Sequence, residues 1–137
     1  MADVGRVLAL DHGSTRIGVA VSDLLGITAH PHSVIAAGPG VLDRIGTLVA
    51  DLDVERIVVG LPVGLDGSEG AAAREARSFA ADVGDATGLP TELVDERFST
   101  VIAERVMIEA GERRDRRRRS RDGVAAAVFL QSYLDAS

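Results

Sequence analysis

The amino-acid sequence predicts an α/β fold in which helices flank a mixed β-sheet, within a single domain that spans residues 1–137. Three observations predict it. The 137 residues suffice for one hydrophobic core but not for two lobes with a cleft between them. Short apolar runs typical of strands alternate with longer segments that have helical spacing. The first two apolar runs are joined by a short turn, which indicates an antiparallel hairpin before the strand–helix–strand units begin.

The first half of the chain is expected to begin with three strands. Two of them, Arg6 to Asp11 and Arg16 to Asp23, flank the turn HGST, and a shorter third strand lies around Ile27 to Ile35. A helix follows in GVLDRIGTLVADLD, because apolar side chains recur there at helical spacing. These side chains are Leu42, Ile45, Val49 and Leu52.

The second half is expected to alternate strands with helices. RIVVGLP is an apolar strand, and TELVDE, residues 91–96, is the last strand. Between them a helix is predicted from Ser68, which suits an N-cap, to Gly88, which ends it. Its apolar stripe is Ala72, Ala76, Phe79 and Val83.

Two more helices are expected after the last strand. One begins at Ser99 or Thr100 and ends at Ala110, and a closing helix runs from Asp122 to Leu134. The order of elements is then three strands followed by helix, strand, helix, strand, helix and helix. This order is that of a ribonuclease H-like fold, with a mixed sheet between layers of helices.

The composition excludes several classes of site and partner. The chain has no cysteine, which rules out disulfides, thiol catalysis and cysteine-ligated zinc. The first residues have no features of an export signal, and no apolar stretch approaches the roughly 20 residues that span a bilayer. We therefore expect a cytoplasmic protein that has no membrane partner.

Positive charge is concentrated in one segment of an otherwise acidic chain. All 15 basic residues are arginine, seven of them lie in residues 112–121, and the net charge is −6. A concentrated arginine cluster is the local feature that phosphate groups would bind, although a solvated loop is the simpler interpretation of a charge run. Because one helix ends at Gly111 and the next begins at Asp122, this segment is expected to form a basic loop.

Acidic side chains end two of the strands and begin the last helix. They are Asp11, Asp95, Glu96 and Asp122. Ligands of open α/β sheets bind beyond the carboxyl ends of the parallel strands, so these acids are expected to converge there. Carboxylates without a thiol or a lysine suit one or two Mg²⁺ or Mn²⁺ ions, which support phosphodiester hydrolysis. Acids at strand ends are also common as ordinary surface residues or helix caps.

Four motifs, in this order and spacing, resemble those of the YqgF (RuvX) family of Holliday junction resolvase-like nucleases. They are LALDHGSTRIGVAVSD, VVGLPVGLDGSEG, VDERFST and DGVAAAVFLQSYL, and the resemblance spans Val7 to Asp135. It implies a ribonuclease H-like fold and a metal-dependent nuclease. It also implies 5′-end processing of precursor 16S rRNA, with the ribosome as a further partner. Resolution of four-way DNA junctions, by analogy with the RuvC resolvases, is the alternative function.

The resemblance assigns roles to individual residues. Asp11 matches the first catalytic and metal-binding acid of the family, Glu96 the second and Asp122 the third. Asp95 is the alternative to Glu96. RuvC resolvases carry their second acid on the strand equivalent to RIVVGLP, where this chain has Gly60, so here the second acid would come from the following strand.

Three groups of residues are candidates for contacts with the phosphates of a nucleic acid. Gly13, Ser14 and Thr15 could equally form a tight hairpin turn, which requires the same residue types. Arg97 could hold a phosphate bidentately or form an internal ion pair. The groups are Gly13, Ser14 and Thr15 of the turn, Arg97 after the last strand, and Arg116, Arg117, Arg118 and Arg119 of the basic segment.

Other classes of function fit parts of the pattern. Actin-like ATPases and sugar kinases also begin with an acid and a Gly-Ser-Thr loop, but they need two lobes around the nucleotide. A non-catalytic RNA-binding module would keep the arginines but would not need three acids. A junction resolvase needs two active sites related by a dyad, so a homodimer, rather than a monomer, would favour that substrate.

Overall fold

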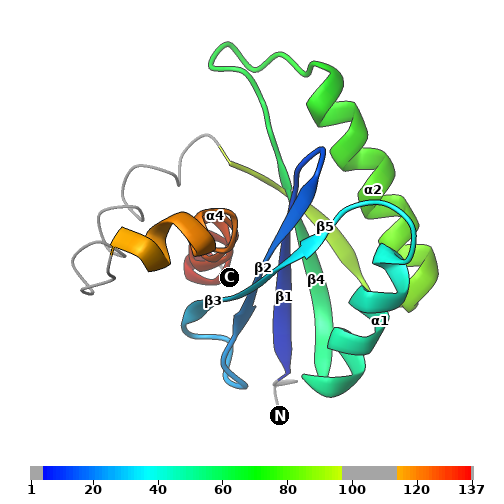
Figure 1. Cartoon of the computed structure of the whole chain (residues 1–137), viewed down its shortest axis with the longest axis vertical. Coiled ribbons are helices and arrows are strands. Elements are labelled where there is room, and N and C mark those ends of the chain that lie inside the picture. The colour runs from blue at the N-terminus through cyan, green and yellow to red at the C-terminus, as the bar shows by residue number, and fades with distance from the viewer. Residues whose placement is uncertain (1–4, 97–113, 137) are drawn as a thin grey trace.

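A computed structural model describes residues 5–96 and 114–136 of the chain, with side chains from residue 123 onward in the second range. The described residues form five strands and three helices, arranged so that α4 covers one face of the sheet and α1 and α2 cover the other (Figure 1). The predicted α/β class, with a mixed sheet flanked by helices, is confirmed. Within the described residues no helix is both long enough and apolar enough to cross a membrane.

The sheet joins an antiparallel hairpin to parallel strands. Its order is β3-β2-β1-β4-β5, with β1 antiparallel to β2 and parallel to β4, and with β4 parallel to β5. The predicted hairpin is therefore confirmed. Because β1, β4 and β5 run in the same direction, their carboxyl ends meet at one end of the sheet, uppermost in Figure 1. The strands are β1 (Arg6–His12), β2 (Arg16–Ser22), β3 (Ala29–Ala36), β4 (Val54–Leu61) and β5 (Thr91–Asp95).

Side chains alternate between two hydrophobic cores along the strands. Leu8 and Leu10 of β1 are fully buried in the core beneath α1 and α2, whereas Ala9 is buried in the core beneath α4. The neighbouring strand β4 alternates likewise, with Val59 in the first core and Val58 in the second. This alternation also determines which polar side chains share a face where the strands end.

The helices α1 (Val41–Asp51) and α2 (Ala71–Thr87) lie close to their predicted positions. In α2 the buried residues include Ala73 rather than the predicted Ala72, which is exposed. The helix ends as predicted, because Gly88 adopts a left-handed φ of 71° and its N–H donates to a carbonyl of the last turn at 2.9 Å. The four predicted apolar side chains of the α1 segment all pack in the core: Leu42, Ile45, Val49 and Leu52.

The start of α2 differs from the prediction. Gly70, not Ser68, is the N-cap residue. Ser68 belongs to the preceding loop, where its backbone N–H donates to the Asp66 carboxylate at 2.9 Å and its carbonyl accepts from the N–H of Gly64 at 2.8 Å. A local turn around the Asp66 side chain thus competes successfully with the capping role that Ser68 could have had.

The last helix, α4 (Arg114–Ala136), begins well before the predicted start at Asp122. The prediction of a basic loop is therefore wrong for residues 114–121, which are helical. Asp122 lies inside the helix and gains nothing from a helix N-terminus. Arginine favours helices, and residues 112–121 contain no glycine or proline, so nothing in this segment stops the helix. The helix predicted to end at Ala110 lies outside the described residues.

Burial and hydrogen bonds hold the described part of α4 on the sheet. Phe129 and Leu130 are almost completely buried. The Gln131 side chain accepts the N–H of Ala29 and donates to the carbonyl of Ile27, both at 2.9 Å. Gln131 thereby ties α4 to the start of β3.

Candidate functional site

Strand alternation decides which of the predicted acids share a face of the sheet. Asp11 comes two residues after Ala9, so both side chains lie on the face that α4 covers. Glu96 comes two residues after Val94, which packs in the same core beneath α4. The N–H of Glu96 donates to the carbonyl of Leu61 at 3.3 Å, so the pairing of β5 with β4 continues through residue 96. Asp11 and Glu96 therefore lie on the same face, at the carboxyl ends of their strands.

Asp95, the alternative second acid, lies on the other face. It comes two residues after Leu93, which packs in the core beneath α1 and α2. Its register partner in β4 is Leu61, a member of that same core. Because side chains alternate with a period of two, exchanging the two acids would exchange the faces. The geometry brings Glu96, and not Asp95, to Asp11.

The side chains of Asp11 and Glu96 are hydrogen-bonded to each other. Burial, followed by the negative charge of Asp11, the hydrogen bond to it and the charge of Asp95, raises the pKa of Glu96 to about 8. A hydrogen bond between two carboxyl groups needs a proton, which Glu96 therefore retains at neutral pH. A pair of this kind can exchange its proton for a cation.

The neighbours of Asp11 across the sheet place no side chain beside it on this face. In the pairing of β1 with β2, Asp11 lies opposite Gly18. In the pairing of β1 with β4, Leu10 lies opposite Val59, and continuing that register by one residue puts Gly60 beside Asp11. Both flanking positions are glycines, which leaves room around the carboxylate.

The third predicted acid, Asp122, lies in the helix that covers the acid pair. The next residue, Gly123, packs closely on the sheet: a Cβ atom there would lie 3.5 Å from the carbonyl oxygens of Val19 and Ser33. The backbone of α4 is therefore close to β2 and β3 at this point. The side chain of Asp122 is outside the described residues, and the described side chains contain no group of three that could hold a metal ion. The three-acid site stays a prediction.

The predicted phosphate loop Gly13, Ser14 and Thr15 forms the β1–β2 hairpin turn. The N–H of Gly13 donates to the carbonyl of Arg16 at 2.9 Å, and a Cβ atom at Gly13 would lie 2.7 Å from that oxygen. The turn therefore accounts for this glycine and uses its N–H. Ser14 and Thr15 are exposed at the same end of the sheet as Asp11, so their hydroxyls remain candidates for phosphate contacts.

The arginines predicted to bind phosphate lie outside the described side chains. Arg97 is outside the described residues altogether. The positions of Arg116, Arg117, Arg118 and Arg119 are in the first part of α4, of which only the backbone is described. Their roles stay predictions.

In the sequence, Gly60 stands out only as the position where RuvC resolvases carry an acid and this chain does not. In the structure the carboxyl group of Glu96 lies against Gly60. A signal was present in the sequence, because a glycine inside an otherwise apolar strand often marks a close approach of another group.

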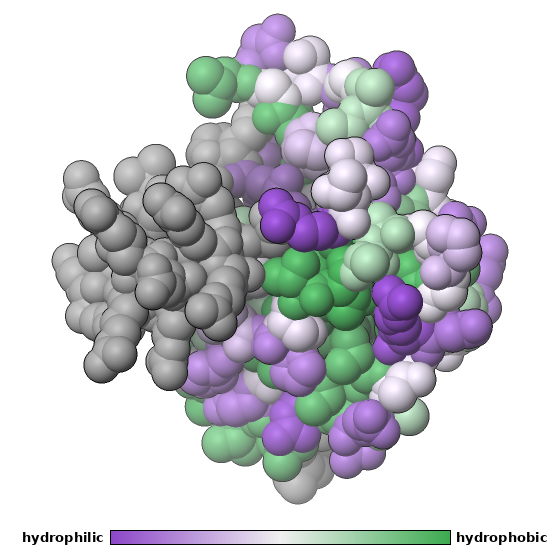
Figure 2. Space-filling model, viewed as in Figure 1, coloured by the Kyte–Doolittle hydropathy of each residue, from purple (hydrophilic) through white to green (hydrophobic). Residues whose placement is uncertain are grey.

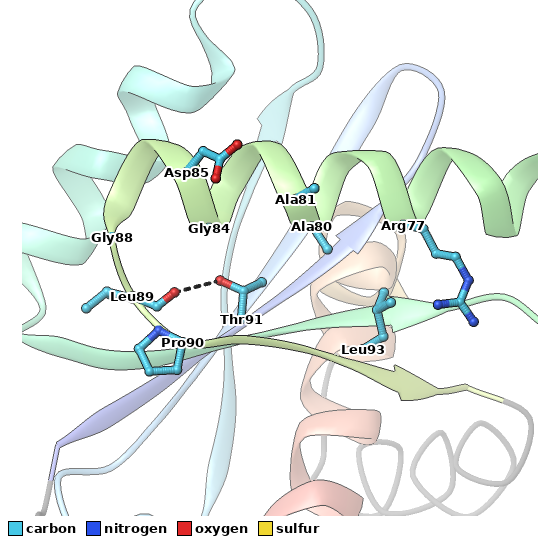
Figure 3. A pocket seen from close by; sticks show the side chains of 10 residues that line it. All are labelled: Arg77, Ala80, Ala81, Gly84, Asp85, Gly88, Leu89, Pro90, Thr91 and Leu93. Atoms are coloured by element: carbon cyan, nitrogen blue, oxygen red, sulfur yellow. Dashed lines mark hydrogen bonds between the residues drawn. The ribbon is translucent and has the colours of Figure 1, made fainter.

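The described residues also form a surface pocket of about 550 Å³ between α2 and β5 (Figure 3). It lies on the face that α1 and α2 cover, away from Asp11 and Glu96, and none of the predicted site residues lines it. In this pocket the Thr91 hydroxyl donates to the carbonyl of Leu89 at 3.1 Å. The other lining residues are Arg77, Ala80, Ala81, Gly84, Asp85, Gly88, Pro90 and Leu93.

Large apolar side chains are exposed at both ends of the described structure (Figure 2). Leu24, Leu25 and Ile27 lie in the β2–β3 turn. Leu65 is 96% exposed and lies in the segment between β4 and α2, at the same end as the acid pair. The carboxyl ends of the parallel strands are thus bordered by an exposed apolar side chain as well as by acids.

Solved structures define the class of fold. RuvC from Thermus thermophilus, solved in complex with a Holliday junction substrate, matches with a TM-score of 0.61 at 15% identity, over 96% of this chain and 94% of that one. A fowlpox virus resolvase, solved with Holliday junction DNA, matches with a TM-score of 0.58 at 10% identity, over 96% and 97% of the two chains. The chain thus has the ribonuclease H-like fold of resolvases, as the order of its elements predicts.

The family follows from the sequence match. The RuvX family model, described as Holliday junction resolvase, matches residues 5–136. The chain belongs to the RuvX family, which confirms the resemblance found in the four motifs. Because resolvases hydrolyse phosphodiester bonds, membership also confirms the prediction of a nuclease.

Curated relatives cover nearly the whole chain. A protein from Pelotomaculum thermopropionicum is 47% identical over 96% of this chain and 87% of its own length. One from Geobacillus kaustophilus is 44% identical over 96% and 98%. One from Lactococcus lactis subsp. lactis is 42% identical over 96% and 94%. Each bears the name "Putative pre-16S rRNA nuclease".

Proposed function

We propose that this nuclease processes the 5′ end of precursor 16S rRNA, with Asp11, Glu96 and Asp122 as its catalytic carboxylates. The contact between the Asp11 and Glu96 side chains carries the proposal, because it joins two acids from separate strands at the carboxyl ends of the sheet. The names of relatives at 42–47% identity support the substrate. We take residues 1–137 as one catalytic domain that acts in the cytoplasm, on RNA alone or on the ribosomal particle.

We further propose that these acids bind one or two divalent cations, Mg²⁺ or Mn²⁺. Carboxylate oxygens are the ligands that such hard cations prefer. The raised pKa of Glu96 fits this proposal, since a cation between Asp11 and Glu96 would offset the repulsion between the two negative charges and favour release of the proton. When bound, such a cation supplies an activated water and stabilises the leaving oxygen of the phosphodiester.

The carboxylates would reach the reaction centre from three different elements. Asp11 is on β1, which is hydrogen-bonded on both sides, so its position is rigid. Glu96 follows β5 and reaches Asp11 from the side. Asp122 would come from α4, the layer above. A site built on separate rigid elements holds its groups in place without help from the substrate.

Binding of the substrate is proposed to involve the sugar-phosphate backbone. The hydroxyls of Ser14 and Thr15 are exposed beside the acid pair, and Arg97 follows Glu96 in the chain. Residues 116–119 add positive charge, but four consecutive positions of a helix are distributed around its circumference. We therefore expect only some of these arginines to contact one nucleic acid strand.

Purified protein incubated with two substrates tests the proposed function. The substrates are an RNA that carries the 5′ precursor sequence of 16S rRNA and a four-way DNA junction, each with Mg²⁺, with Mn²⁺ and with a chelator. We expect cleavage of the RNA that requires a divalent cation and is absent in Asp11→Asn. RNA that stays intact under all conditions would contradict the proposal.

The second candidate function is resolution of four-way DNA junctions, which the description of the family favours. Paired cleavage of a junction requires two sites related by a dyad. A homodimer that makes symmetric paired nicks, while leaving the RNA uncut, would establish this function in place of the first.

A further inference from the structure

Gly60 interrupts the apolar run of β4 at the point where β4 passes the acid pair. A Cβ atom on this residue would lie 2.5 Å from Oε1 of Glu96 and 2.8 Å from its Cδ atom. The same atom would lie 2.8 Å from Cε2 of the Phe129 ring. Contacts this short force a neighbour to shift, so any other residue type at position 60 would displace the carboxyl end of the flexible Glu96 side chain, the buried Phe129 ring or both.

The register of the sheet explains the crowding. Gly60 pairs with Val94 in β5, two residues before Glu96, and lies beside Asp11 when the register of β1 with β4 is continued. The Glu96 side chain extends from the end of β5 across Gly60 and is hydrogen-bonded to Asp11. The carboxyl group therefore occupies volume that a side chain at position 60 would fill.

Phe129 closes this space from the side of the helix. Its ring is 1% exposed and belongs to the core beneath α4. The Glu96 carboxyl and the edge of the Phe129 ring therefore share the space over Gly60, which we call the slot. Burial is also the main cause of the raised pKa of Glu96.

We propose that Gly60 is a positioning residue for the second catalytic acid: its missing side chain creates the slot in which the Glu96 carboxyl is held against Asp11. This inference rests on the proposed function, because it concerns an acid that the proposed reaction requires. The competing explanation is that Gly60 only makes room for the Phe129 ring, in which case it has no effect on the position of Glu96.

A double-mutant cycle on stability separates the two explanations without measuring activity. It compares the thermal unfolding of four metal-free proteins: wild type, Gly60→Ala, Glu96→Ala and the double variant. We expect Gly60→Ala to lower Tm in the wild-type background and to lower it by less than half as much once the Glu96 carboxyl is removed. Equal losses in both backgrounds would overturn the inference, because the methyl group would then act through Phe129 alone.

The cycle includes a control variant and an outcome that decides if Gly60→Ala does not fold. Gly46→Ala in α1 is the control, since a Cβ atom there has nothing within 4 Å, and it should not lower Tm. If Gly60→Ala alone fails to fold, the double variant decides: folding restored by Glu96→Ala supports the inference, and failure of both variants overturns it.

Kinetics on the proposed RNA substrate then connect Gly60 to the reaction. We expect Gly60→Ala to lower kcat at least tenfold with KM nearly unchanged, and Gly46→Ala to match wild type. If Glu96→Gln is inactive but Gly60→Ala is fully active, the inference about Gly60 fails while the proposed function stands. If Glu96→Gln cleaves the RNA at the wild-type rate, the proposed function fails, whatever Gly60→Ala does.

Discussion

Two carboxylate sites lie at opposite ends of the sheet, and their surroundings have opposite effects on the acid. At one end, Asp23 follows β2 and accepts the backbone N–H groups of Ile27 at 2.7 Å and Thr28 at 3.2 Å. These bonds, the one from Ile27 above all, lower the pKa of Asp23. At the other end, burial and the charge of Asp11 raise the pKa of Glu96 to about 8.

The difference separates an acid that serves the fold from the acids that we propose for catalysis. Backbone donors stabilise the ionised form of Asp23, so this carboxylate helps to hold the β2–β3 turn without a second acid or a cation. The ionised form of Glu96 is disfavoured beside Asp11, and a bound cation would favour it. An acid whose pKa is raised by burial and by a second acid is typical of a functional site, whereas an acid surrounded by donors is typical of a structural one.

The strongest test of this comparison removes one charge at each end. Asp11→Asn and Glu96→Gln should each lower the rate of RNA cleavage by at least about 10³-fold, because each removes an acid that acts as part of one unit. The double variant should be scarcely worse than either single variant. Asp23→Asn, the matched control at the other end, should keep the wild-type rate. Wild-type cleavage by Asp11→Asn would contradict the assignment of the site.

A second pair of variants tests the choice of acid at the end of β5. Asp95 and Glu96 are adjacent, but they lie on opposite faces of the sheet. Asp95→Asn should therefore retain most of the activity that Glu96→Gln loses. An inactive Asp95→Asn together with an active Glu96→Gln would show that the assignment is wrong by one residue.

The four arginines at residues 116–119 are expected to affect RNA binding but not the cleavage step itself. Replacing Arg116, Arg117, Arg118 and Arg119 by glutamine should weaken RNA binding and reduce the slope of log K against log salt, by roughly 0.7 for each phosphate that the variant no longer neutralises. The helical position of these residues leads us to expect that one or two of the four arginines bind phosphate. Cleavage at saturating RNA should persist. Unchanged affinity across a salt titration would mean that the RNA binds elsewhere.

A smaller effect is expected in the pH dependence of stability. The Glu96 pKa is raised from an ordinary value of 4.5 to about 8 in the folded protein, so the folded state keeps a proton that the unfolded state loses between these values. The contribution of Glu96 to the stability of the metal-free protein should therefore fall as pH rises from about 4.5 to about 8, by at most about 1.4 kcal/mol per pH unit. Urea unfolding at a series of pH values measures this.

Glu96→Gln is the control for the pH experiment. It keeps the size of the side chain but cannot ionise, so its stability should lack this decline and exceed that of wild type near pH 8. Adding Mg²⁺ at pH 8 should raise Tm of the wild type and have less effect on Glu96→Gln. Identical pH profiles for the two proteins would show that the carboxyl group of Glu96 is not held as described.

The smallest effect is expected at the structural end. Asp23→Asn should weaken the hydrogen bonds from Ile27 and Thr28 and lower Tm at neutral pH by on the order of a few degrees. Because the folded-state pKa of Asp23 lies below its ordinary 3.8, its contribution is present above that pH and is lost as pH falls below it. The Tm values of the variant and of the wild type should thus become equal at acid pH. A constant Tm difference down to low pH would contradict this.

Local sequence patterns predicted the strands well, because both faces of the central strands are buried and their apolar runs are continuous. Helix boundaries were less predictable. Ser68 and Asp122 both suit an N-cap in isolation. Ser68 instead belongs to a turn around the Asp66 side chain, and Asp122 lies inside α4 because the helix-favouring arginines before it are helical. Capping preferences are too small to fix an end when neighbouring residues favour another conformation.

Sequence patterns alone predicted the order of the described elements, the hairpin around Asp11 and the residue types available for a carboxylate site. The pairing of β5 with β4 in the folded sheet places Glu96, and not Asp95, on the face of Asp11, because neighbouring residues of a strand point to opposite faces. The folded structure also raises the pKa of Glu96, through burial, through the charge and hydrogen bond of Asp11 and through the charge of Asp95. Asp11 is far from Glu96 in the chain, and burial and charge act through space, so no local pattern could contain their effect.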